Sequence, residues 1–366
     1  KQRLSDRAFM PVENSSPMPY WSEDICYKFT AAQIDELEAA ANELHARCLD
    51  AVQHVMDKDL FHRFGIPEHM KDYIKKSWER GDPDIYGRFD FAYDGVNPPK
   101  MLEYNADTPT SLYEASVLQW DWMQDKKLPD QFNSIHERLV DTWKRLNKTY
   151  NMPKPFYFAT HSEAVEDLIT TEYMRGTAEE AGIKTKPIDI SEIGWNGDHF
   201  TDLDENRMGG FWKLYPWEWM AQEEFGKHIA KDNTAVAEPA WKMLLSNKAI
   251  LPILWEMFPD HPNLLPTYET PEPLRGEAYV KKPILGREGA NVEIVTPEFK
   301  EAVEGSYGKE GYIYQKYTPL PDFDGNYPVI GAWIVGGESA GMGIRESHGS
   351  KITTNICRFV PHYFTP

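Results

Sequence analysis

The stretch RFDFAYDGVNPPKMLEYN, residues 88–105, places two runs of alternating polar and apolar residues on either side of a turn-rich centre. This pattern predicts two strands, 86–93 and 100–105, that pair as an antiparallel hairpin closed by residues 94–99. In that register position 93 faces 100, 90 faces 103 and 88 faces 105. Side chains two apart share a face of a strand, so the polar residues of both strands are expected to project together: Arg88, Asp90, Glu103 and Asn105.

The apolar residues of the hairpin are expected on its opposite face: Phe89, Phe91, Leu102 and Tyr104. On the polar face, opposed carboxylates repel each other unless a cation neutralises them. Mg²⁺ prefers carboxylate and carbonyl oxygens shared with substrate phosphates, and a neighbouring guanidinium can bind a phosphate through two hydrogen bonds. The alternative is that Arg88 alone balances both carboxylates in a surface network, and the hairpin by itself favours neither interpretation.

The composition argues against several classes of protein. The chain has 366 residues, with 58 acidic and 39 basic side chains and a formal charge of −19, which argues against a nucleic-acid partner. An acidic surface most often serves solubility, although it would also attract a cationic substrate. No run of 18 apolar residues predicts a membrane span, and residues 1–10 lack the apolar core of a signal peptide. Three widely spaced cysteines suit a reducing compartment, so we expect a cytoplasmic protein.

The remaining pattern predicts a mixed α/β fold. Helices are expected at 30–57, where Thr30 and Gln33 form a capping-box pattern, and at 67–80, 111–125, 131–147 and 239–247. A strand at 155–160, a helix ending at Gly182 and a strand at 184–190 predict an α/β module. Residues 277–317 are expected to form strands separated by a glycine-bearing loop and a helix. The turn GGES predicts a final hairpin between 329–335 and 340–347.

The two common nucleotide-binding fingerprints are absent from the sequence. Neither G-x-x-x-x-G-K-[ST] nor a G-x-G-x-x-G between a strand and a helix occurs. Three other features are compatible with phosphate or adenine binding: the loop after Lys282 in YVKKPILGREGANV, the isolated Lys248 in SNKAIL, and the strand YIYQKYTPL at 312–320. Taken singly, each is explained as well by an ordinary turn, a solvated lysine or a buried strand.

Together these stretches resemble a known family. RFDFAYDG, PPKMLEYNADTPTSL, NKAILPILW, KKPILGREGANV, PDFDGNYPVIGAWIV and GIRES are similar to the synthetase domain of the glutathionylspermidine synthase family, a member of the ATP-grasp superfamily. The resemblance runs from about residue 18 to the C-terminus. It implies an ATP-grasp fold with a mobile lid, in three parts: a central domain at 18–151 plus 322–366, a substrate-side α/β subdomain at 152–239, and a lid subdomain at 240–321.

The resemblance also implies roles for individual residues. Arg88 and Arg345 match catalytic arginines, and Asp90, Glu103 and Asn105 match Mg²⁺ ligands. Positions matching the ATP site are Arg88, Lys248, Lys282, Gly286, Glu288, Gly289, Gln315, Lys316, Tyr317 and Thr318. Positions matching the substrate side are Thr108, Ser111, Glu166 and Asp167, of which the last two fall where the family holds its polyamine. A solvated helix terminus explains that acidic pair equally well.

The implied function is ATP- and Mg²⁺-dependent ligation of a peptide or amino-acid carboxylate to a polyamine or other amine, through an acyl phosphate. Fewer than 90 residues precede the hairpin, so we expect a stand-alone form without the amidase domain of the bifunctional members. Leu214 stands where a Thr of the thiol-peptide site is expected, which leaves the acid open. Two alternatives are a regulatory ATP-binding protein without ligase activity and a kinase that stops at phosphorylation.

Overall fold

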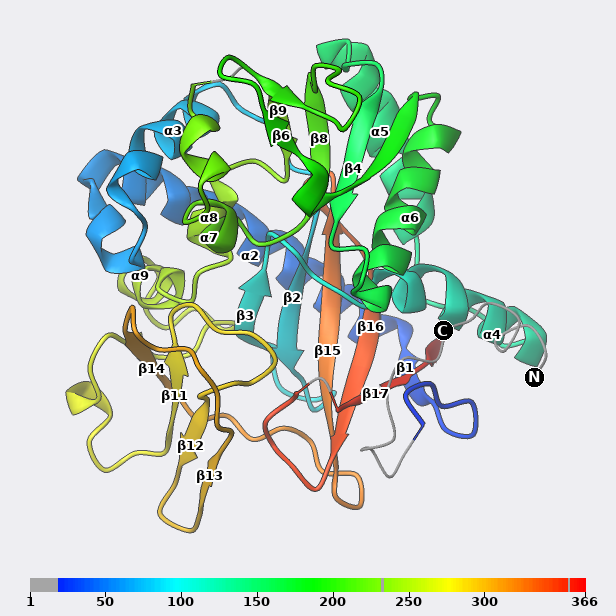
Figure 1. The fold of residues 1–366 in the computed structure, drawn as a ribbon. Helices are drawn as coiled ribbons and strands as arrows, with labels where there is room; N and C mark the ends of the chain where they lie inside the picture. The colour runs from blue at the N-terminus through cyan, green and yellow to red at the C-terminus, as the bar shows by residue number, and fades with distance from the viewer. Residues whose placement is uncertain (1–18, 232–233, 355) are drawn as a thin grey trace.

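The computed structural model describes residues 19–231, 234–354 and 356–366 (Figure 1). The N-terminal stretch in which we expect no signal peptide lies outside these ranges. The helices are α2 (Ala31–Lys58), α3 (Glu68–Glu79), α4 (Gln119–Lys126), α5 (Ile135–Tyr150), α6 (Val165–Glu180), α7 (Trp217–Met220), α8 (Lys242–Leu245) and α9 (Ile250–Met257). In the described part of the chain, no helix has the length and apolar character needed to cross a membrane.

A central antiparallel sheet joins the first third of the chain to its last part. Its strand order is β17-β16-β15-β2-β3, and its strands are β2 (Tyr86–Ala92), β3 (Lys100–Asn105), β15 (Asn326–Val335), β16 (Glu338–His348) and β17 (Arg358–Val360). The long helix α2 packs along β15 and β16, behind the sheet in Figure 1. The capping box expected at its start is confirmed, because Thr30 and Gln33 exchange hydrogen bonds.

The predicted hairpin forms, with one irregularity in its register. Arg88 pairs with Asn105 and Asp90 with Glu103, as expected, but Phe91 pairs with Met101 and residue 92 with residue 100. Leu102 is therefore the extra residue of a β-bulge, and the predicted pairing of 93 with 100 is wrong. The bulge reverses the side-chain alternation beyond it. Met101 takes the core position, fully buried, whereas Leu102 lies at the wall of a cavity instead of on the apolar face.

A second sheet, in which all strand pairs are parallel, lies beside one end of the central sheet (Figure 1). Its order is β5-β4-β8-β9, with β4 (Phe156–Thr160), β5 (Thr185–Asp189), β8 (Gly210–Leu214) and β9 (Ala235–Ala237). The β4–α6–β5 module agrees with the expected α/β unit. The interior strand β8 has no counterpart in the sequence interpretation, since its residues lie in an aromatic-rich segment with no clear alternation.

A third sheet holds the glycine-bearing loop. Its order is β10-β14-β11-β12-β13, with β10 (Thr267–Tyr268), β11 (Tyr279–Pro283), β12 (Glu293–Val295), β13 (Lys300–Ala302) and β14 (Tyr312–Lys316). The helix expected between these strands is wrong, because 300–302 form a strand that pairs with β12. Pairing across the Thr296–Phe299 turn overrides the local helical preference of that segment.

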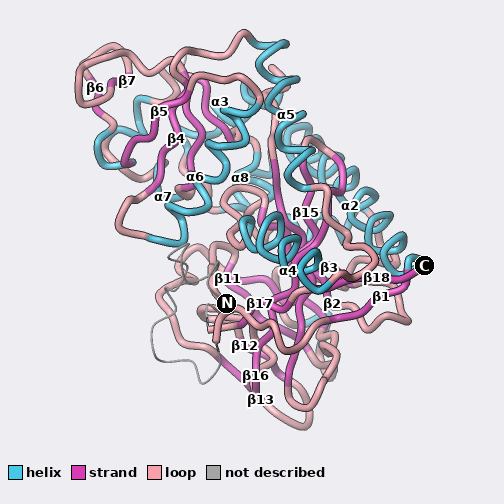
Figure 2. Tube along the Cα trace, turned by 90° about the vertical axis from the view of Figure 1, so that its right-hand side faces the viewer, coloured by secondary structure: helices cyan, strands magenta, loops and turns pink. Residues whose placement is uncertain are grey.

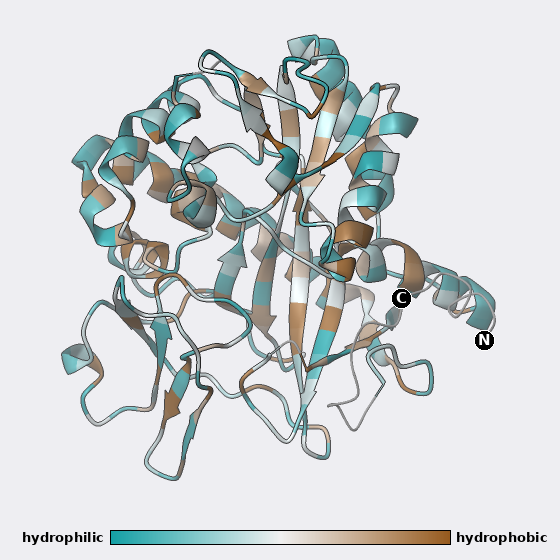
Figure 3. Ribbon diagram, viewed as in Figure 1, coloured by the Kyte–Doolittle hydropathy of each residue, from teal (hydrophilic) through white to brown (hydrophobic). Residues whose placement is uncertain are grey.

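Two further sheets have two strands each. In one, β1 (Tyr27–Thr30) pairs parallel with β18 (His362–Thr365), and in the other, β6 (Gly194–Trp195) pairs antiparallel with β7 (Phe200–Thr201). Figure 2 shows the β11–β13 region next to the central sheet in a second view. Hydrophobic residues gather on the strands of the central sheet, and the outer turns of α3 and α5 are hydrophilic (Figure 3). The division of the chain into three domains stays a prediction.

Candidate active site

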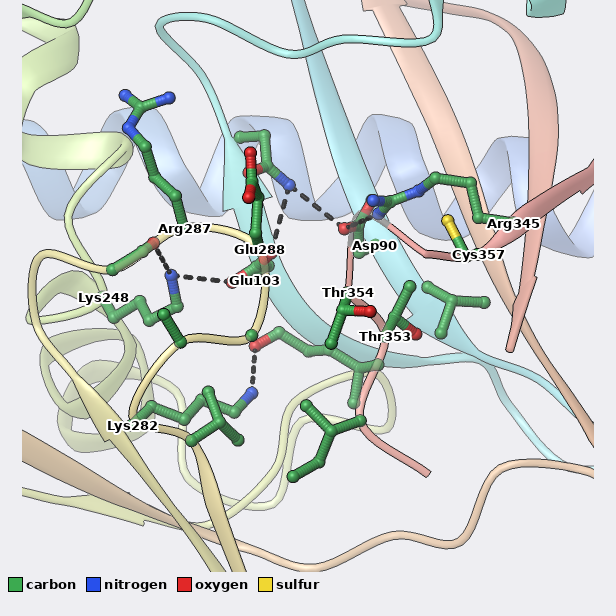
Figure 4. A pocket seen from close by; sticks show the side chains of 18 of the residues that line it. Asp90, Glu103, Lys248, Lys282, Arg287, Glu288, Arg345, Thr353, Thr354 and Cys357 are labelled. Carbon is green, nitrogen blue, oxygen red and sulfur yellow. Dashed lines mark hydrogen bonds and ion pairs between the residues drawn. The ribbon is translucent and has the colours of Figure 1, made fainter. Parts of the chain in front are cut away.

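A cavity of about 280 Å³ lies where the hairpin, the third sheet and the start of α6 meet (Figure 4). Every residue to which the resemblance assigns a role lines it: Arg88, Asp90, Glu103, Asn105, Thr108, Ser111, Glu166, Asp167, Lys248, Lys282, Gly286, Glu288, Gly289, Gln315, Lys316, Tyr317, Thr318 and Arg345. These residues are spread over more than 250 positions of the sequence, and the fold brings them to one cavity. Their individual roles stay predictions.

Two guanidinium groups converge on Asp90 at one end of the cavity. Arg88 donates from Nε to Asp90 at 2.8 Å and from Nη1 to the Thr110 carbonyl at 2.5 Å. Arg345, on the neighbouring strand β16, donates from Nη2 to the other Asp90 oxygen at 2.5 Å. Asp90 is only 3% exposed. Burial alone would lower the pKa of Arg345, but the Asp90 carboxylate outweighs it and holds that pKa above its usual range, so the Arg345 guanidinium stays charged.

Two lysines surround Glu103 on the opposite side. Lys248 Nζ lies 2.9 Å from a Glu103 carboxylate oxygen and donates to the Gly286 carbonyl at 2.9 Å. Lys282 Nζ donates to the Leu102 carbonyl at 3.0 Å, which the β-bulge presents, and to Gln315 Oε1 at 2.7 Å. Burial raises the pKa of Glu103, but the two ammonium groups outweigh burial and bring it well below the usual range. Burial lowers the pKa of Lys282 to about 8.

The oxygen ligands of the hairpin fit a hard divalent cation. Among the described residues, no cluster of three or more His, Cys, Asp and Glu side chains could hold a metal ion, so the third ligand of the predicted set has to be the Asn105 amide. In the structure that amide donates to Asp90 at 3.2 Å and to Glu103 at 3.3 Å. It therefore lies between the two carboxylates, and a half-turn would present its oxygen alongside theirs, the donor set that Mg²⁺ prefers.

The acidic pair lies in the first turn of α6 and faces the same cavity. Glu166 is exposed at the cavity wall, yet the surrounding protein removes enough water to raise the pKa of its carboxyl, and Glu288 raises it further. Partial burial and the charge of Glu166 raise the pKa of Asp167 to about 6. Ser111, also in the wall, has a left-handed backbone with φ of 67°, which is uncommon for a residue other than glycine. Arg345 and Arg88 act against the rise in pKa for Glu166, and Arg287 acts against it for Asp167, but burial and the neighbouring carboxylates outweigh them.

The far end of the cavity is apolar. Four aliphatic side chains line it near the 315–318 strand and turn: Leu265, Val280, Ile294 and Leu320. Such a slot between strands is suited to a flat heterocycle. Lys316 contributes to this wall, but its ammonium pairs with Glu277 at 2.6 Å. Lys248 and Lys282 are the lysines whose ammonium groups contact the hairpin, at Glu103 and the Leu102 carbonyl.

The glycine-bearing loop 284–292 covers part of the cavity. A Cβ atom at Gly289, which has a φ of +72°, would lie 2.8 Å from an Ile352 methyl and 2.9 Å from the Thr353 carbonyl. Only glycine therefore allows the loop to approach the 351–357 segment this closely. Arg287 in this loop has several polar partners outside it.

Several cavity residues were not assigned a role from the sequence. They are Tyr20, Leu102, Arg287, Lys351, Ile352, Thr353, Thr354 and Cys357. The loop sequence GREG already pointed to Arg287. Leu102 belongs to the hairpin motif but was expected on its apolar face. The others carry no motif, because 351–357 is an irregular connection and Tyr20 lies far from the hairpin in sequence.

Comparison with known proteins agrees with this geometry. The family model described as glutathionylspermidine synthase preATP-grasp matches residues 1–365. A Haemophilus influenzae protein with the provisional name acid–amine ligase is 44% identical, and the match covers 97% of this chain and 93% of that protein. The trypanothione synthetase of Crithidia fasciculata is 32% identical over 84% of this chain and 52% of its own length. The bifunctional glutathionylspermidine synthetase/amidase of Escherichia coli is 29% identical, over 91% of this chain and 57% of that one. The chain thus spans just over half the length of these last two relatives.

Two solved structures share the fold at low sequence identity. A glutathione synthetase-like effector from Globodera pallida superimposes with a TM-score of 0.57 at 11% identity, covering 93% of this chain and 89% of that one. A Methylobacillus flagellatus protein provisionally named γ-glutamylcysteine synthetase gives 0.51 at 10% identity, covering 92% and 89%. They share the mixed α/β fold of this chain, and the family model assigns that fold to the ATP-grasp type. The match along nearly the whole sequence shows that this chain belongs to the glutathionylspermidine synthase preATP-grasp family, and that it is an enzyme of the acid–amine ligase class.

Proposed function

We propose that the protein joins a carboxylate to an amine with ATP and Mg²⁺ as the activating pair, through an acyl phosphate. The carboxylate attacks the γ-phosphoryl group of ATP and ADP leaves. The amine then attacks the acyl carbon, phosphate leaves, and an amide remains. The observation that supports this most directly is the single cavity in which four cations, from Arg88, Arg345, Lys248 and Lys282, surround the two carboxylates of the hairpin.

Each part of the cavity has a task in this scheme. The apolar end beside 315–318 takes the adenine, and Lys248 with Lys282 directs the phosphates towards the hairpin. Arg88 and Arg345 stabilise the charge on the transferred phosphoryl group, since fixed cations in a water-poor cavity act strongly on developing charge. Asp90, Glu103 and Asn105 would hold Mg²⁺, which neutralises the phosphate oxygens when bound.

The amine is proposed to be cationic, such as a polyamine or another basic amine. Glu166 and Asp167 lie at the cavity wall. Burial together with a neighbouring carboxylate, Glu288 for Glu166 and Glu166 for Asp167, raises both of their pKa values. An ammonium group between them would relieve the repulsion between these carboxylates. The net charge of −19 would also favour the approach of a cation. The cytoplasmic setting stays a prediction from the sparse cysteines, which are free in the structure.

The test is a screen for phosphate release from Mg-ATP that depends on both an acid and an amine, with the product identified by its mass. Peptides and amino acids are offered as acids, and spermidine-like and neutral amines as nucleophiles. Formation of an amide product that Asp90→Ala abolishes supports the proposal. ATP turnover with an acid alone, giving a stable phosphorylated product, would show a kinase instead, and ATP binding without turnover under any pair would show a regulatory protein.

A further inference from the structure

Arg287 leaves the glycine-bearing loop in a direction away from the phosphate-binding lysines. Figure 4 shows its guanidinium running away from Lys248 and Lys282. It donates from Nη1 to Thr108 Oγ1 at 2.9 Å, and from Nη2 and Nε to Glu218 Oε1 at 3.0 and 3.3 Å. The guanidinium also lies 5.6 Å from the centre of the Trp219 ring. Three contacts of different chemistry thus hold one side chain of the loop from outside it.

The two acceptors of Arg287 are fixed in place by a buried ion pair. Asp107 accepts from Lys213 Nζ at 2.6 Å and from the Trp217 backbone N–H at 2.9 Å, and both charged side chains are fully buried. Lys213 Nζ also donates to the Tyr215 carbonyl at 2.9 Å. Thr108 follows Asp107 in sequence and Glu218 follows Trp217. The pair therefore places the Thr108 hydroxyl and the Glu218 carboxylate side by side, and together they form the receptor for Arg287.

The ion pair between Arg287 and Glu218 is partly shielded from solvent, so it contributes to holding the loop. The Glu218 side chain is 17% exposed and that of Arg287 31%. Burial lowers the pKa of Arg287, but the Glu218 carboxylate outweighs burial and raises it. Charge-assisted hydrogen bonds in a partly dry setting are stronger than those between neutral groups. Opening the loop would break this contact together with the packing of Gly289 on 352–354.

We propose that Glu218 is a positioning residue, which holds Arg287 and with it the loop 284–292 in the closed position and so keeps water from the activated acid. This inference rests on the proposed function. With the loop open, water can attack the acyl phosphate in place of the amine, so that the acid and free phosphate are regenerated. The net reaction of that leak is hydrolysis of one ATP to ADP and phosphate without an amide. Glu218 contacts no reacting atom in this scheme, and it acts through Arg287.

The first test measures the loop directly and does not require activity. Glu218→Gln keeps the size of the side chain and removes its charge. Glu223→Gln is the matched control, because Glu223 lies on the same segment and accepts a hydrogen bond from the Tyr215 hydroxyl rather than from the loop. Amide hydrogen exchange of residues 284–292 is expected to rise about tenfold in Glu218→Gln, corresponding to one weakened charge-assisted bond, and to match the parent in Glu223→Gln. Equal exchange in Glu218→Gln and the parent would overturn the proposal.

The second test measures coupling, with the acid and amine that the screen above identifies. The ratio of phosphate released to amide formed is expected to rise in Glu218→Gln by up to the same factor as the amide hydrogen exchange of the loop. The KM for ATP is expected to change by a smaller factor than this ratio. An unchanged ratio in a variant whose loop exchanges faster would overturn the role in coupling. If no acid and amine pair is turned over by the parent, the proposed function fails, whereas the exchange experiment still decides whether Glu218 holds the loop.

Discussion

Replacing Asp107 by Asn tests the buried ion pair on which the receptor for Arg287 is built. Asn has nearly the shape of Asp but no charge, so the change leaves the fully buried Lys213 ammonium without its carboxylate partner, while its hydrogen bond to the Tyr215 carbonyl remains. The amide also has one oxygen and one NH₂ where two acceptors served Lys213 and Trp217. One of these two donors therefore loses its partner.

The expected destabilisation follows from these contacts. Removing one partner of a buried ion pair typically costs about 3–5 kcal/mol. Lys213 limits the loss, because burial already lowers its pKa and it can release its proton once Asp107 is gone. Deprotonating at pH 7 a lysine with an unfolded pKa of about 10.4 costs about 4.6 kcal/mol, which is an upper bound on the charge term. We therefore expect the free energy of unfolding to fall by about 3–5 kcal/mol at pH 7.

The same reasoning predicts the direction of the pH dependence. In Asp107→Asn the folded state holds a neutral Lys213 and the unfolded state a charged one, so the unfolded state binds one more proton. The free energy of unfolding then rises with pH, by up to about 1.4 kcal/mol per unit. Between pH 7 and pH 9 the variant should recover up to about 2.7 kcal/mol relative to the parent.

Urea unfolding followed by tryptophan fluorescence measures the free energy of unfolding of variant and parent at pH 7, 8 and 9. Urea is chosen because it is uncharged and leaves ionic interactions unscreened. The double variant Asp107→Asn with Lys213→Met is the control, because it lacks the titrating ammonium and should show no recovery. A single variant as stable as the parent at pH 7, or one whose deficit stays constant up to pH 9, would refute the assignment of a buried, charged pair.

Three further predictions concern the cavity itself. Glu103→Ala should lower Mg²⁺-dependent phosphate release about 100-fold or more while leaving the urea midpoint near that of the parent, and turnover at the parental rate with unchanged Mg²⁺ dependence would contradict the metal assignment. Because burial lowers the pKa of Lys282 to about 8, its positive charge is lost between pH 7 and 9, so the KM for ATP should rise over that range and Lys282→Met should abolish the rise. Glu166→Gln combined with Asp167→Asn should raise the KM for a cationic amine and leave that for ATP nearly constant, and a preference of the parent for neutral amines would argue against a cationic nucleophile.

The polar face of the hairpin could be predicted from the sequence because strand alternation is a local property. Two-residue spacing determines which side chains share a face, and it placed Asp90 opposite Glu103 and Arg88 opposite Asn105, as the structure has them. The bulge at Leu102 could not be read in the same way, because a bulge depends on the partner strand and its surroundings. The extra residue turns the Leu102 carbonyl towards Lys282, which comes from another sheet.

The resemblance of motifs identified the cavity residues but did not give their arrangement in space. Lys248, Lys282 and Arg345 had no evident relation to the hairpin from spacing alone, since they are separated from it by more than 140 residues. The helix expected within 277–317 was wrong for a related reason. Residues 300–302 have a local helical preference that pairing with β12 overrides. The stability of a strand depends more on the side chains and strands packed against it than on its own residues.

The sequence by itself determined the class of fold, the family and the polar face of one hairpin, because these depend on alternation, caps and motifs that are local in the chain. Only the tertiary structure decided that Arg287 is held by Glu218 and Thr108, and that the buried pair of Asp107 and Lys213 sets these two acceptors side by side. Each of those contacts joins segments about 70 to 180 residues apart. Charges and hydrogen-bonding groups act over a few ångströms, so their partners are settled by how the sheets pack together and not by their order in the chain.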